Sequence, residues 1–307
     1  MILEKRRFDV TALGELLIDF QYLPESGTYK ANPGGAPANV LSQIAKLGGS
    51  TAFIGKVGRD SFGRQLRDTL TGLRIDVSGL MTDNTAPTTL AFVANNDNGE
   101  REFSFYRTGT ADTNLNVNEI PAKLLAESRV FHFGTLSLSH MPAASATEAA
   151  IETAKHSGCL ISFDPNLRPA LWDNLKSAKE RIRFGAENCD IMKISREEVE
   201  FAELSPSLFP KLTFVTDGAK GSDCYYNQTR FHSEAYSVNA VDTTGAGDSF
   251  LGAALFRLLE LDLDELTEPQ ILDVLDFASA AGALVTTHFG ALLSMASKQE
   301  ISKLQKK

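Results

Sequence analysis

One stretch in the C-terminal third combines glycines, an acid and the start of an apolar helix. Gly245, Ala246 and Gly247 precede Asp248, and apolar residues then recur at helical spacing from Phe250 onward. The start of a helix offers unpaired backbone N–H groups, and glycines let an anion approach them closely. An acid beside that anion can accept a proton. The stretch therefore predicts an anion-binding turn with its own base, unless the acid only complements the helix dipole.

Other polar residues follow apolar runs that we predict to be strands, and in α/β sheets ligands bind beyond the carboxyl ends of strands. Asp19 closes the first such run, where a carboxylate can accept strong hydrogen bonds from the hydroxyls of a polyol. The segments 164–168, 193–195 and 216–218 follow later runs. We expect these groups to cluster at one edge of a sheet, although Asp19 alone would also fit a solvated strand end.

Strands and helices alternate through most of the chain, which is typical of a parallel sheet with helices on both faces. The strands are predicted over 10–20, 51–57, 129–134, 159–164, 190–194 and 211–217, and the helices over 40–47, 62–73, 142–156 and 174–187. A turn signal at 95–99 between two β-rich runs predicts a hairpin in a separate small sheet. The expected division is a main domain of 1–14, 34–87 and 112–307 and a small β lid of 15–33 and 88–111.

Composition narrows the classes of protein. The chain has 307 residues, 43% of them apolar, and can form a sizeable core. Its formal net charge of −9 argues against a general binder of nucleic acid or membrane surfaces. Cys159, Cys189 and Cys224 have no paired spacing, so neither a disulfide framework nor a zinc site is indicated. Without a secretory leader or an apolar run that could span a bilayer, a cytoplasmic location is expected.

Two arginines are candidate ligands for a carboxylated or densely hydroxylated sugar. Because side chains alternate along a strand, Phe105 and Arg107 should share one face, and Arg168 follows a later strand. Each arginine could instead lie on the surface. Ser195 and Glu198 have the spacing of a helix capping box, which explains both without any function.

Residues 242–250 resemble, position for position, the C-terminal signature of the ribokinase-like (PfkB) carbohydrate kinases, and residues 34–39 resemble their N-terminal glycine motif. Neither a Walker A motif nor a strand followed by G-x-G-x-x-G is present. The resemblance implies a ribokinase-like three-layer α/β sandwich with a central, mostly parallel sheet and a small β-sheet lid. It also implies ATP and Mg²⁺ as cofactors, K⁺ as in many relatives, and a homodimer formed through the lid.

The resemblance assigns roles to individual residues. Asp248 would be the base, with Gly245, Ala246 and Gly247 forming the anion hole. The sugar would be bound by Asp19, Gly34, Gly35, Asn39, Phe105, Arg107, Asn166 and Arg168. The nucleotide would be bound by Lys193, Ser195, Thr216, Gly218, Gly221, Ser279 and Ala283. Glu198 would support Mg²⁺ through water, and the K⁺ site would comprise Asp242, Thr244, Val285, His288, Gly290 and Ser294. Relatives commonly have asparagine where Ser195 and Ser279 stand.

Within the family the chain resembles fructokinases most in four motifs, at residues 14–20, 33–39, 105–107 and 164–172. The resemblance implies ATP-dependent phosphorylation of D-fructose to fructose 6-phosphate. One alternative is a 2-keto-3-deoxygluconate kinase, whose substrate carboxylate would meet Arg107 or Arg168. The alternative from another class is a non-catalytic sugar-binding regulator on a kinase scaffold, against which the presence of Asp248 and its glycines argues.

Overall fold

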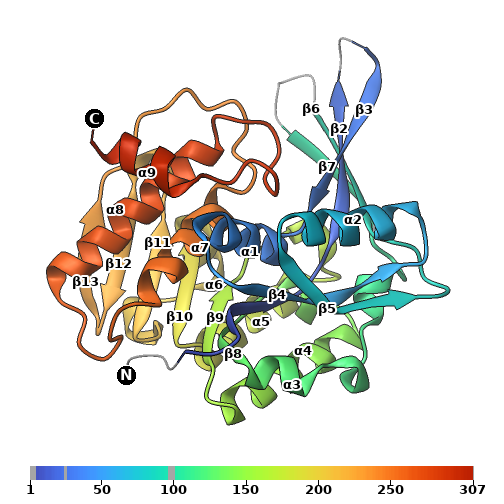
Figure 1. The fold of residues 1–307 in the computed structure, drawn as a ribbon, viewed down its shortest axis with the longest axis horizontal. Helices are drawn as coiled ribbons and strands as arrows, with labels where there is room; N and C mark the ends of the chain where they lie inside the picture. The colour runs from blue at the N-terminus through green and yellow to red at the C-terminus, as the bar shows by residue number, and fades with distance from the viewer. Residues whose placement is uncertain (1–4, 24–25, 96–100, 307) are drawn as a thin grey trace.

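The computed structural model describes residues 5–23, 26–95 and 101–306, and Figure 1 shows how they are arranged. A nine-stranded sheet has the strand order β13-β12-β11-β10-β9-β8-β1-β4-β5, and a separate four-stranded sheet has the order β3-β2-β6-β7. The small sheet stands beside one end of the large sheet in Figure 1. The predicted α/β class, with one large and one small sheet, is confirmed.

The elements have the following bounds. The large sheet contains β1 (Phe8–Leu13), β4 (Thr51–Gly58), β5 (Ile75–Asp83), β8 (Ser128–Gly134), β9 (Leu160–Asp164), β10 (Ile191–Ser195), β11 (Leu212–Thr216), β12 (Ser222–Tyr226) and β13 (Thr229–Ser233). The small sheet contains β2 (Leu17–Leu23), β3 (Thr28–Gly34), β6 (Leu90–Asn95) and β7 (Arg101–Tyr106). The α-helices are α1 (Ala36–Leu47), α2 (Ser61–Gly72), α3 (Ala122–Ala126), α4 (Ala143–His156), α5 (Leu175–Asn188), α6 (Arg196–Ala202), α7 (Ala246–Leu258), α8 (Glu268–Val285) and α9 (Lys298–Gln305).

The large sheet separates two hydrophobic cores. Its strands are parallel to their neighbours from β5 across to β11, and β12 and β13 are antiparallel at one edge. Successive strand residues face opposite sides, so Val130 belongs to one core and Phe131 to the other. Buried residues of α1, α2, α7 and α8 complete the first core, and those of α3, α4, α5 and α6 complete the second. The result is a three-layer arrangement.

The predicted single strand over 10–20 is wrong, because the structure divides it between the two sheets. β1 ends at Leu13 and β2 begins at Leu17. Between them Gly14 packs so closely on Pro37 that a Cβ would lie 2.6 Å from the proline ring. Both strands are buried where they meet, so the apolar pattern runs through the break. Asp19 consequently lies inside a strand of the small sheet rather than at a strand end.

The small sheet leads directly into the first helix. β3 ends at Gly34, and Gly35 is the N-cap of α1 with a φ of 131°. A Cβ on Gly35 would clash with the backbone of Glu15, so glycine is required there. The predicted turn and helix after residue 34 are confirmed. Within the described part of the chain, no helix combines the length and apolarity that crossing a membrane requires.

Candidate active site

The predicted anion-binding turn lies at the start of a buried helix. Ala246 is the first residue of α7, and Gly245 precedes it with a φ of +80°, where a Cβ would clash with Ala291. Asp248 lies in the first turn, is only 8% exposed, and accepts a hydrogen bond of 2.8 Å at Oδ2 from Nδ2 of Asn39. The two glycine motifs of the sequence therefore meet at Asp248.

A buried lysine lies against the same turn. A Cβ on Gly247 would lie 2.6 Å from Nζ of Lys193, so the ammonium occupies the space that a side chain there would need. The ammonium also donates to the carboxylate of Asp164, at 3.0 Å from Oδ2 and 3.2 Å from Oδ1. Burial opposes its charge, yet the carboxylates of Asp164, Glu198 and Asp248 together raise the pKa of Lys193. The turn thus has a protonated lysine beside it at neutral pH.

The electrostatics of Asp248 suit a proton acceptor. Burial raises the pKa of this carboxyl, whereas the hydrogen bond from Asn39 and the positive charges of Lys193 and Arg168 oppose the rise. A base is most effective when its pKa approaches the operating pH, so a raised carboxyl pKa favours proton transfer.

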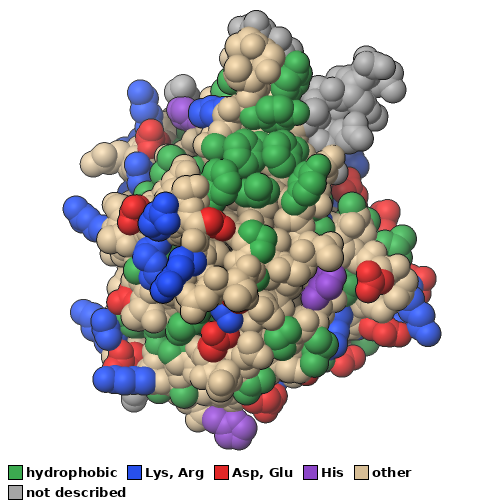
Figure 2. All heavy atoms as spheres, turned by 90° about the vertical axis from the view of Figure 1, so that its right-hand side faces the viewer, with side chains coloured by type: hydrophobic (Ala, Val, Ile, Leu, Met, Phe, Trp, Pro, Cys, Tyr) green, Lys and Arg blue, Asp and Glu red, His purple; other side chains and the backbone are tan. Residues whose placement is uncertain are grey.

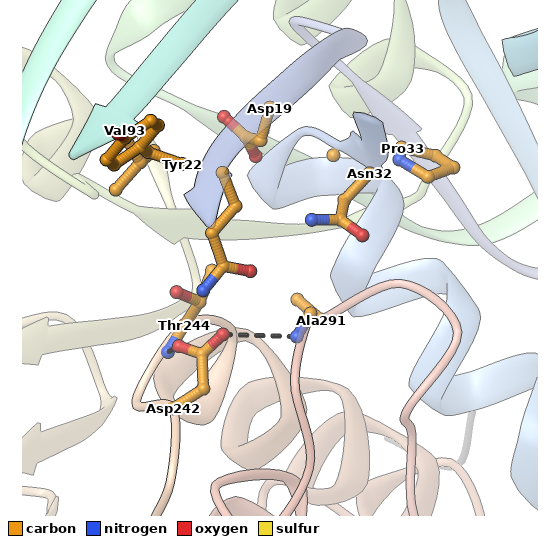
Figure 3. Close-up of a pocket in the computed structure, with 11 residues that line it drawn as sticks. Asp19, Tyr22, Asn32, Pro33, Val93, Asp242, Thr244 and Ala291 are labelled. Atoms are coloured by element: carbon orange, nitrogen blue, oxygen red, sulfur yellow. Dashed lines mark hydrogen bonds between the residues drawn. The ribbon is translucent and has the colours of Figure 1, made fainter. Parts of the chain in front are cut away.

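Figure 3 shows a pocket of about 80 Å³ between the small sheet and the loop that precedes α7. Its lining residues are Asp19, Gln21, Tyr22, Asn32, Pro33, Gly34, Val93, Asp242, Thr244, Gly290 and Ala291. The carboxylate of Asp19 lies over Gly34, where any Cβ would clash with Oδ2. Burial raises the pKa of Asp19 to about 6. The positive charge of Arg168 opposes this rise, and the negative charge of Asp242 adds to it. Carboxylates and amides facing one pocket suit a ligand rich in hydroxyl groups.

A smaller cavity of about 10 Å³ is lined by Glu15, Ala36, Pro37, His132, Gly134, Thr135, Leu136, Asp164, Pro165 and Asn166. Oε1 of Glu15 accepts a hydrogen bond of 2.9 Å from the N–H of Ala36, the first residue of α1. Burial raises the pKa of Glu15 to about 7. Glu15 and Asn32 have no predicted role, and Asp164 is predicted only as part of the polar segment 164–168, without a role of its own. Glu15 and Asp164 each stand at or just beyond the carboxyl end of a strand, which was the available signal.

The loop at 164–168 approaches both carboxylates of the site. Asn166 has a left-handed φ of +45° and lines the smaller cavity. The positive charge of Arg168 counteracts the rise in pKa of both Asp19 and Asp248. The structure therefore brings these two candidate sugar ligands to the same edge of the sheet as the base.

Arg107 is placed differently from the prediction. β7 ends at Tyr106, so the alternation that would align Arg107 with Phe105 stops before it. The buried guanidinium donates from Nε to Oδ2 of Asp112 at 2.7 Å, from Nη1 to Oγ of Ser139 at 2.8 Å, and from Nη2 to a backbone carbonyl at 2.8 Å. Neither Phe105 nor Arg107 is among the described residues that line the two cavities. Arg107 makes the contacts of an internal ion pair, and its contact with a sugar stays a prediction.

The capping-box interpretation of Ser195 and Glu198 is confirmed. Oγ of Ser195 accepts from the N–H of Glu198 at 3.2 Å, and Oε2 of Glu198 accepts from the N–H of Ser195 at 2.8 Å, at the start of α6. Oε1 of Glu198 accepts a further hydrogen bond of 2.7 Å from the N–H of Leu167. The carboxylate therefore fixes two loops, and support of a metal stays a prediction.

The other predicted nucleotide residues lie beyond β11 and on α8. Thr216 ends β11, and the turn that follows contains Gly218 and Gly221 with φ values of +54° and +90°. On α8, Oγ of Ser279 is 3.1 Å from Oγ of Ser222. Ala283 lies one turn further along the same helix. These residues form an edge next to the start of α7, since a Cβ on Gly282 of α8 would lie 3.1 Å from the carbonyl oxygen of Ala246.

The segments predicted to hold a monovalent cation come together. Oδ1 of Asp242 accepts from the N–H of Thr244 at 2.8 Å, and Oδ2 accepts from the N–H of Gly290 at 3.1 Å (Figure 3). In the second segment the carbonyl of Val285 accepts from the N–H of His288 at 3.3 Å, and Oγ of Ser294 donates to a backbone carbonyl at 3.1 Å. The described residues contain no cluster of three or more His, Cys, Asp or Glu suited to a metal ion. A cation here would rely on backbone carbonyls.

Comparisons with known proteins agree with this geometry. The family described as pfkB family carbohydrate kinase matches residues 7–298. Fructokinase-1 of Zea mays is 39% identical over 97% of this chain and 98% of its own length. The structure is similar to that of the fructokinase with bound ATP from Xylella fastidiosa, with a TM-score of 0.91, 30% identity and 98% of each chain covered.

A second solved structure is a double mutant of the fructokinase from Vibrio cholerae O395 in its fructose-, ADP- and potassium-bound form. Its TM-score is 0.89 at 31% identity, over 98% of this chain and 99% of that one. The two-sheet α/β architecture is therefore the ribokinase-like fold. Since the family pattern spans nearly the whole chain, the protein belongs to the pfkB family of carbohydrate kinases.

Proposed function

We propose that the protein is an ATP-dependent fructokinase that transfers the γ-phosphoryl group of ATP to the terminal hydroxyl of D-fructose, giving fructose 6-phosphate. The observation that carries the proposal is Asp248, a buried carboxylate beside Asn39 at the start of α7. The fructokinase names of relatives with about 30–40% identity support the choice of sugar. In this proposal Asp19, Gly34, Gly35, Asn39, Asn166 and Arg168 hold the sugar hydroxyls.

Phosphoryl transfer requires positioning and charge stabilisation more than a strong base, because its transition state is loose. Asp248 would accept the hydroxyl proton as the new O–P bond forms. The backbone N–H groups of Gly245, Ala246 and Gly247 would stabilise charge on the transferring group, as an oxyanion hole does. On the nucleotide side, the edge formed by β10, β11 and α8 would hold ATP through Lys193 and the turn beyond Thr216.

Two cations fit residues that are present. Mg²⁺ neutralises charge on the β- and γ-phosphates when bound. Both oxygens of Glu198 already accept backbone N–H groups but keep free lone pairs, so this carboxylate would support Mg²⁺ through water. K⁺ would be held by the loops around Asp242 and Gly290, and the potassium in the Vibrio cholerae fructokinase structure supports this assignment.

The small sheet would act as a lid that closes over bound sugar and excludes water, a competing phosphoryl acceptor.

The aromatic face of the small sheet would join two copies into a homodimer. Tyr29 and Tyr106 are 48% and 64% exposed and both make edge contacts with Phe92. Figure 2 shows hydrophobic side chains gathered on this sheet. Sedimentation should give a dimer that Tyr106→Glu dissociates, whereas Leu208→Glu, at a 57% exposed leucine of the main body, leaves it intact. A monomeric wild type would refute the dimer.

Turnover on fructose and on 2-keto-3-deoxygluconate, followed as ADP release, tests the proposed reaction. We expect fructose to be the better substrate, and a preference for the keto acid would replace fructokinase by the second kinase. Arg168 supports 2-keto-3-deoxygluconate kinase as the second candidate, because its positive charge lowers the pKa of both Asp19 and Asp248 and could also pair with a substrate carboxylate. No ADP release with any sugar of a broad panel would instead favour a non-catalytic binding protein.

Asp248→Asn tests the assigned base. We expect kcat to fall by about 10²–10⁴-fold, while the dissociation constant for fructose, measured by calorimetry, changes little. Asp68→Asn, at an exposed position of α2, makes the same chemical change away from the site and should leave kcat unaltered. Turnover that survives in Asp248→Asn would contradict the role of the base.

A further inference from the structure

The carboxylate of Asp164 contacts two parts of the site at once. Asp164 is the last residue of β9, is 2% exposed, and precedes the loop that carries Asn166 and Arg168. Lys193 lies beside it in the neighbouring strand β10, where Met192 pairs with Phe163. The last residue of one strand therefore faces a lysine of the next at the carboxyl edge of the sheet.

On one side, Asp164 holds Lys193. Its two carboxylate oxygens lie 3.0 and 3.2 Å from the ammonium, which on its far side lies against Gly247 of the anion-binding turn. Within the described residues, the ammonium donates hydrogen bonds to no group other than this carboxylate. A lysine ammonium has three N–H donors, so capacity remains for an anion in the turn.

On the other side, Asp164 shapes the loop. Its Oδ1 also accepts the N–H of Asn166 at 3.2 Å, where the backbone turns through a left-handed φ of +45°. One carboxylate thus sets the conformation of a loop with two candidate sugar ligands and the position of a cation at the phosphoryl site.

We propose that Asp164 is a positioning residue, which aims Lys193 at the transferring phosphoryl group and through its second contact aligns the 164–168 loop for the sugar. Lys193 would then be a catalytic residue that stabilises charge on that group. This inference rests on the proposed kinase activity. The contact with Lys193 depends on the negative charge of Asp164, whereas the contact with the N–H of Asn166 needs only an oxygen acceptor. Two substitutions of Asp164 can therefore separate the two contacts.

Asp164→Asn removes the negative charge but keeps an oxygen that can accept the N–H of Asn166. We expect kcat to fall by about 10–100-fold, less than the loss of a whole oxyanion-hole donor, with the KM for fructose nearly unchanged. Asp164→Ala removes both contacts, so we expect the same loss in kcat together with a KM for fructose raised by about tenfold. This split between kcat and KM would not follow from a purely structural ion pair.

A double-mutant cycle tests the route through Lys193. Lys193→Met alone should lower kcat strongly, and adding Asp164→Asn to it should lower kcat by less than about threefold more, because both changes remove one interaction. Independent, multiplicative losses would contradict the proposal. Fructose binding measured by calorimetry without nucleotide gives a second readout, in which Asp164→Ala should bind fructose more weakly than Asp164→Asn.

Lys56 supplies a matched control, because it is also a buried lysine paired with carboxylates, 3.4 Å from Asp83 and 2.9 Å from Glu119. Lys56→Met should lower stability yet leave kcat of the folded enzyme within about twofold. Asp164→Asn with wild-type kcat would overturn the inference while leaving the kinase proposal intact. Failure of the wild type to phosphorylate any sugar would instead overturn the kinase proposal itself.

Discussion

Two buried ion pairs, one in each region of the molecule, are hydrogen-bonded to different degrees. At the base of the small sheet, Arg107 donates to Asp112, to a serine hydroxyl and to a backbone carbonyl. Asp112 in turn accepts from the hydroxyls of two threonines. Beneath the turn at α7, Lys193 donates only to Asp164 among the described residues. All three guanidinium nitrogens of Arg107 donate to protein groups, whereas the ammonium of Lys193 contacts a single carboxylate and keeps one N–H donor for a ligand.

Arg107 and Lys193 are buried to a similar extent, but their surroundings suit different roles. A buried charge that loses its partner is costly, so a pair that is also hydrogen-bonded to neighbouring segments holds those segments together. Arg107 connects the end of β7 with the segment near Ser139 and so anchors the small sheet to the main body. A lysine that is held by one carboxylate beside the turn at Gly247 can instead direct its remaining N–H donor at an anion.

The largest effect should come from breaking the pair at the base of the small sheet. Asp112→Ala leaves the guanidinium of Arg107 buried without its carboxylate, and we expect the free energy of unfolding to fall by about 3–5 kcal/mol. Chemical denaturation measures this change. A loss below about 1 kcal/mol, the range of exposed pairs, would show that the pair contributes little to stability.

Gly247→Ala tests the other pair by displacing its lysine. The new Cβ would lie 2.6 Å from Nζ of Lys193, a flexible end that can move at little cost to stability. We expect kcat to fall by about 10–100-fold as the ammonium leaves the turn, while denaturation shows stability that is equal or slightly higher, since alanine favours a helix. Gly72→Ala, which meets nothing within 4 Å at the end of α2, is the control and should leave kcat unchanged. Unaltered kcat in Gly247→Ala would mean that the position of Lys193 has no catalytic role.

The next effect concerns Asp19, whose pKa is raised to about 6 by burial. The ionised carboxylate is the stronger acceptor of sugar hydroxyls, so affinity for fructose should decline as pH falls through 6, approaching tenfold per pH unit well below it. The stability of the sugar-free protein should change in the opposite direction with pH. Between about pH 4 and pH 6 the unfolded chain has already released the proton of Asp19 while the folded protein still holds it, so the free energy of unfolding falls as the pH rises through this range. Calorimetry from pH 5 to 8 measures the affinity, and Asp19→Asn should flatten the profile. A pH-independent wild type would refute this role.

The smallest effect extends the comparison to the surface. Arg7 pairs with Asp76 at 3.3 Å and Glu127 at 3.1 Å but is 59% exposed. Arg7→Ala should therefore change the free energy of unfolding by only about 0–1 kcal/mol, measured by the same denaturation as Asp112→Ala. A loss as large as that of the buried pair would show that burial is not what distinguishes them.

Local patterns predicted the helix after Gly245, the helix after residue 34 and the alternation of strands and helices, because each depends on residues close in sequence. The same patterns could not show that residues 10–20 belong to two sheets, since both strands are buried. β5 was not predicted, because its burial is irregular along the strand and gives no clean alternation.

The site was less predictable than the fold. The contact between Asn39 and Asp248 joins residues 209 apart in sequence, and the family resemblance assigned both residues to one site without indicating that they touch. The ion pair of Arg107 with Asp112 could not be predicted, because alternation does not show that the strand ends at Tyr106. Asp164 was predicted only as part of the segment 164–168, because its own role depends on Lys193 in the neighbouring strand, which no spacing along the chain can reveal.

Gly35 is the single residue between β3 of the small sheet and α1 of the main body. Any motion of β3 must therefore reach the first turn of α1, where Asn39 contacts the base. An extra residue inserted at this junction would let the sheet move without moving that turn. If the small sheet closes on a sugar as proposed, the length of the chain at Gly35, as much as its chemistry, would couple that closure to the alignment of Asp248.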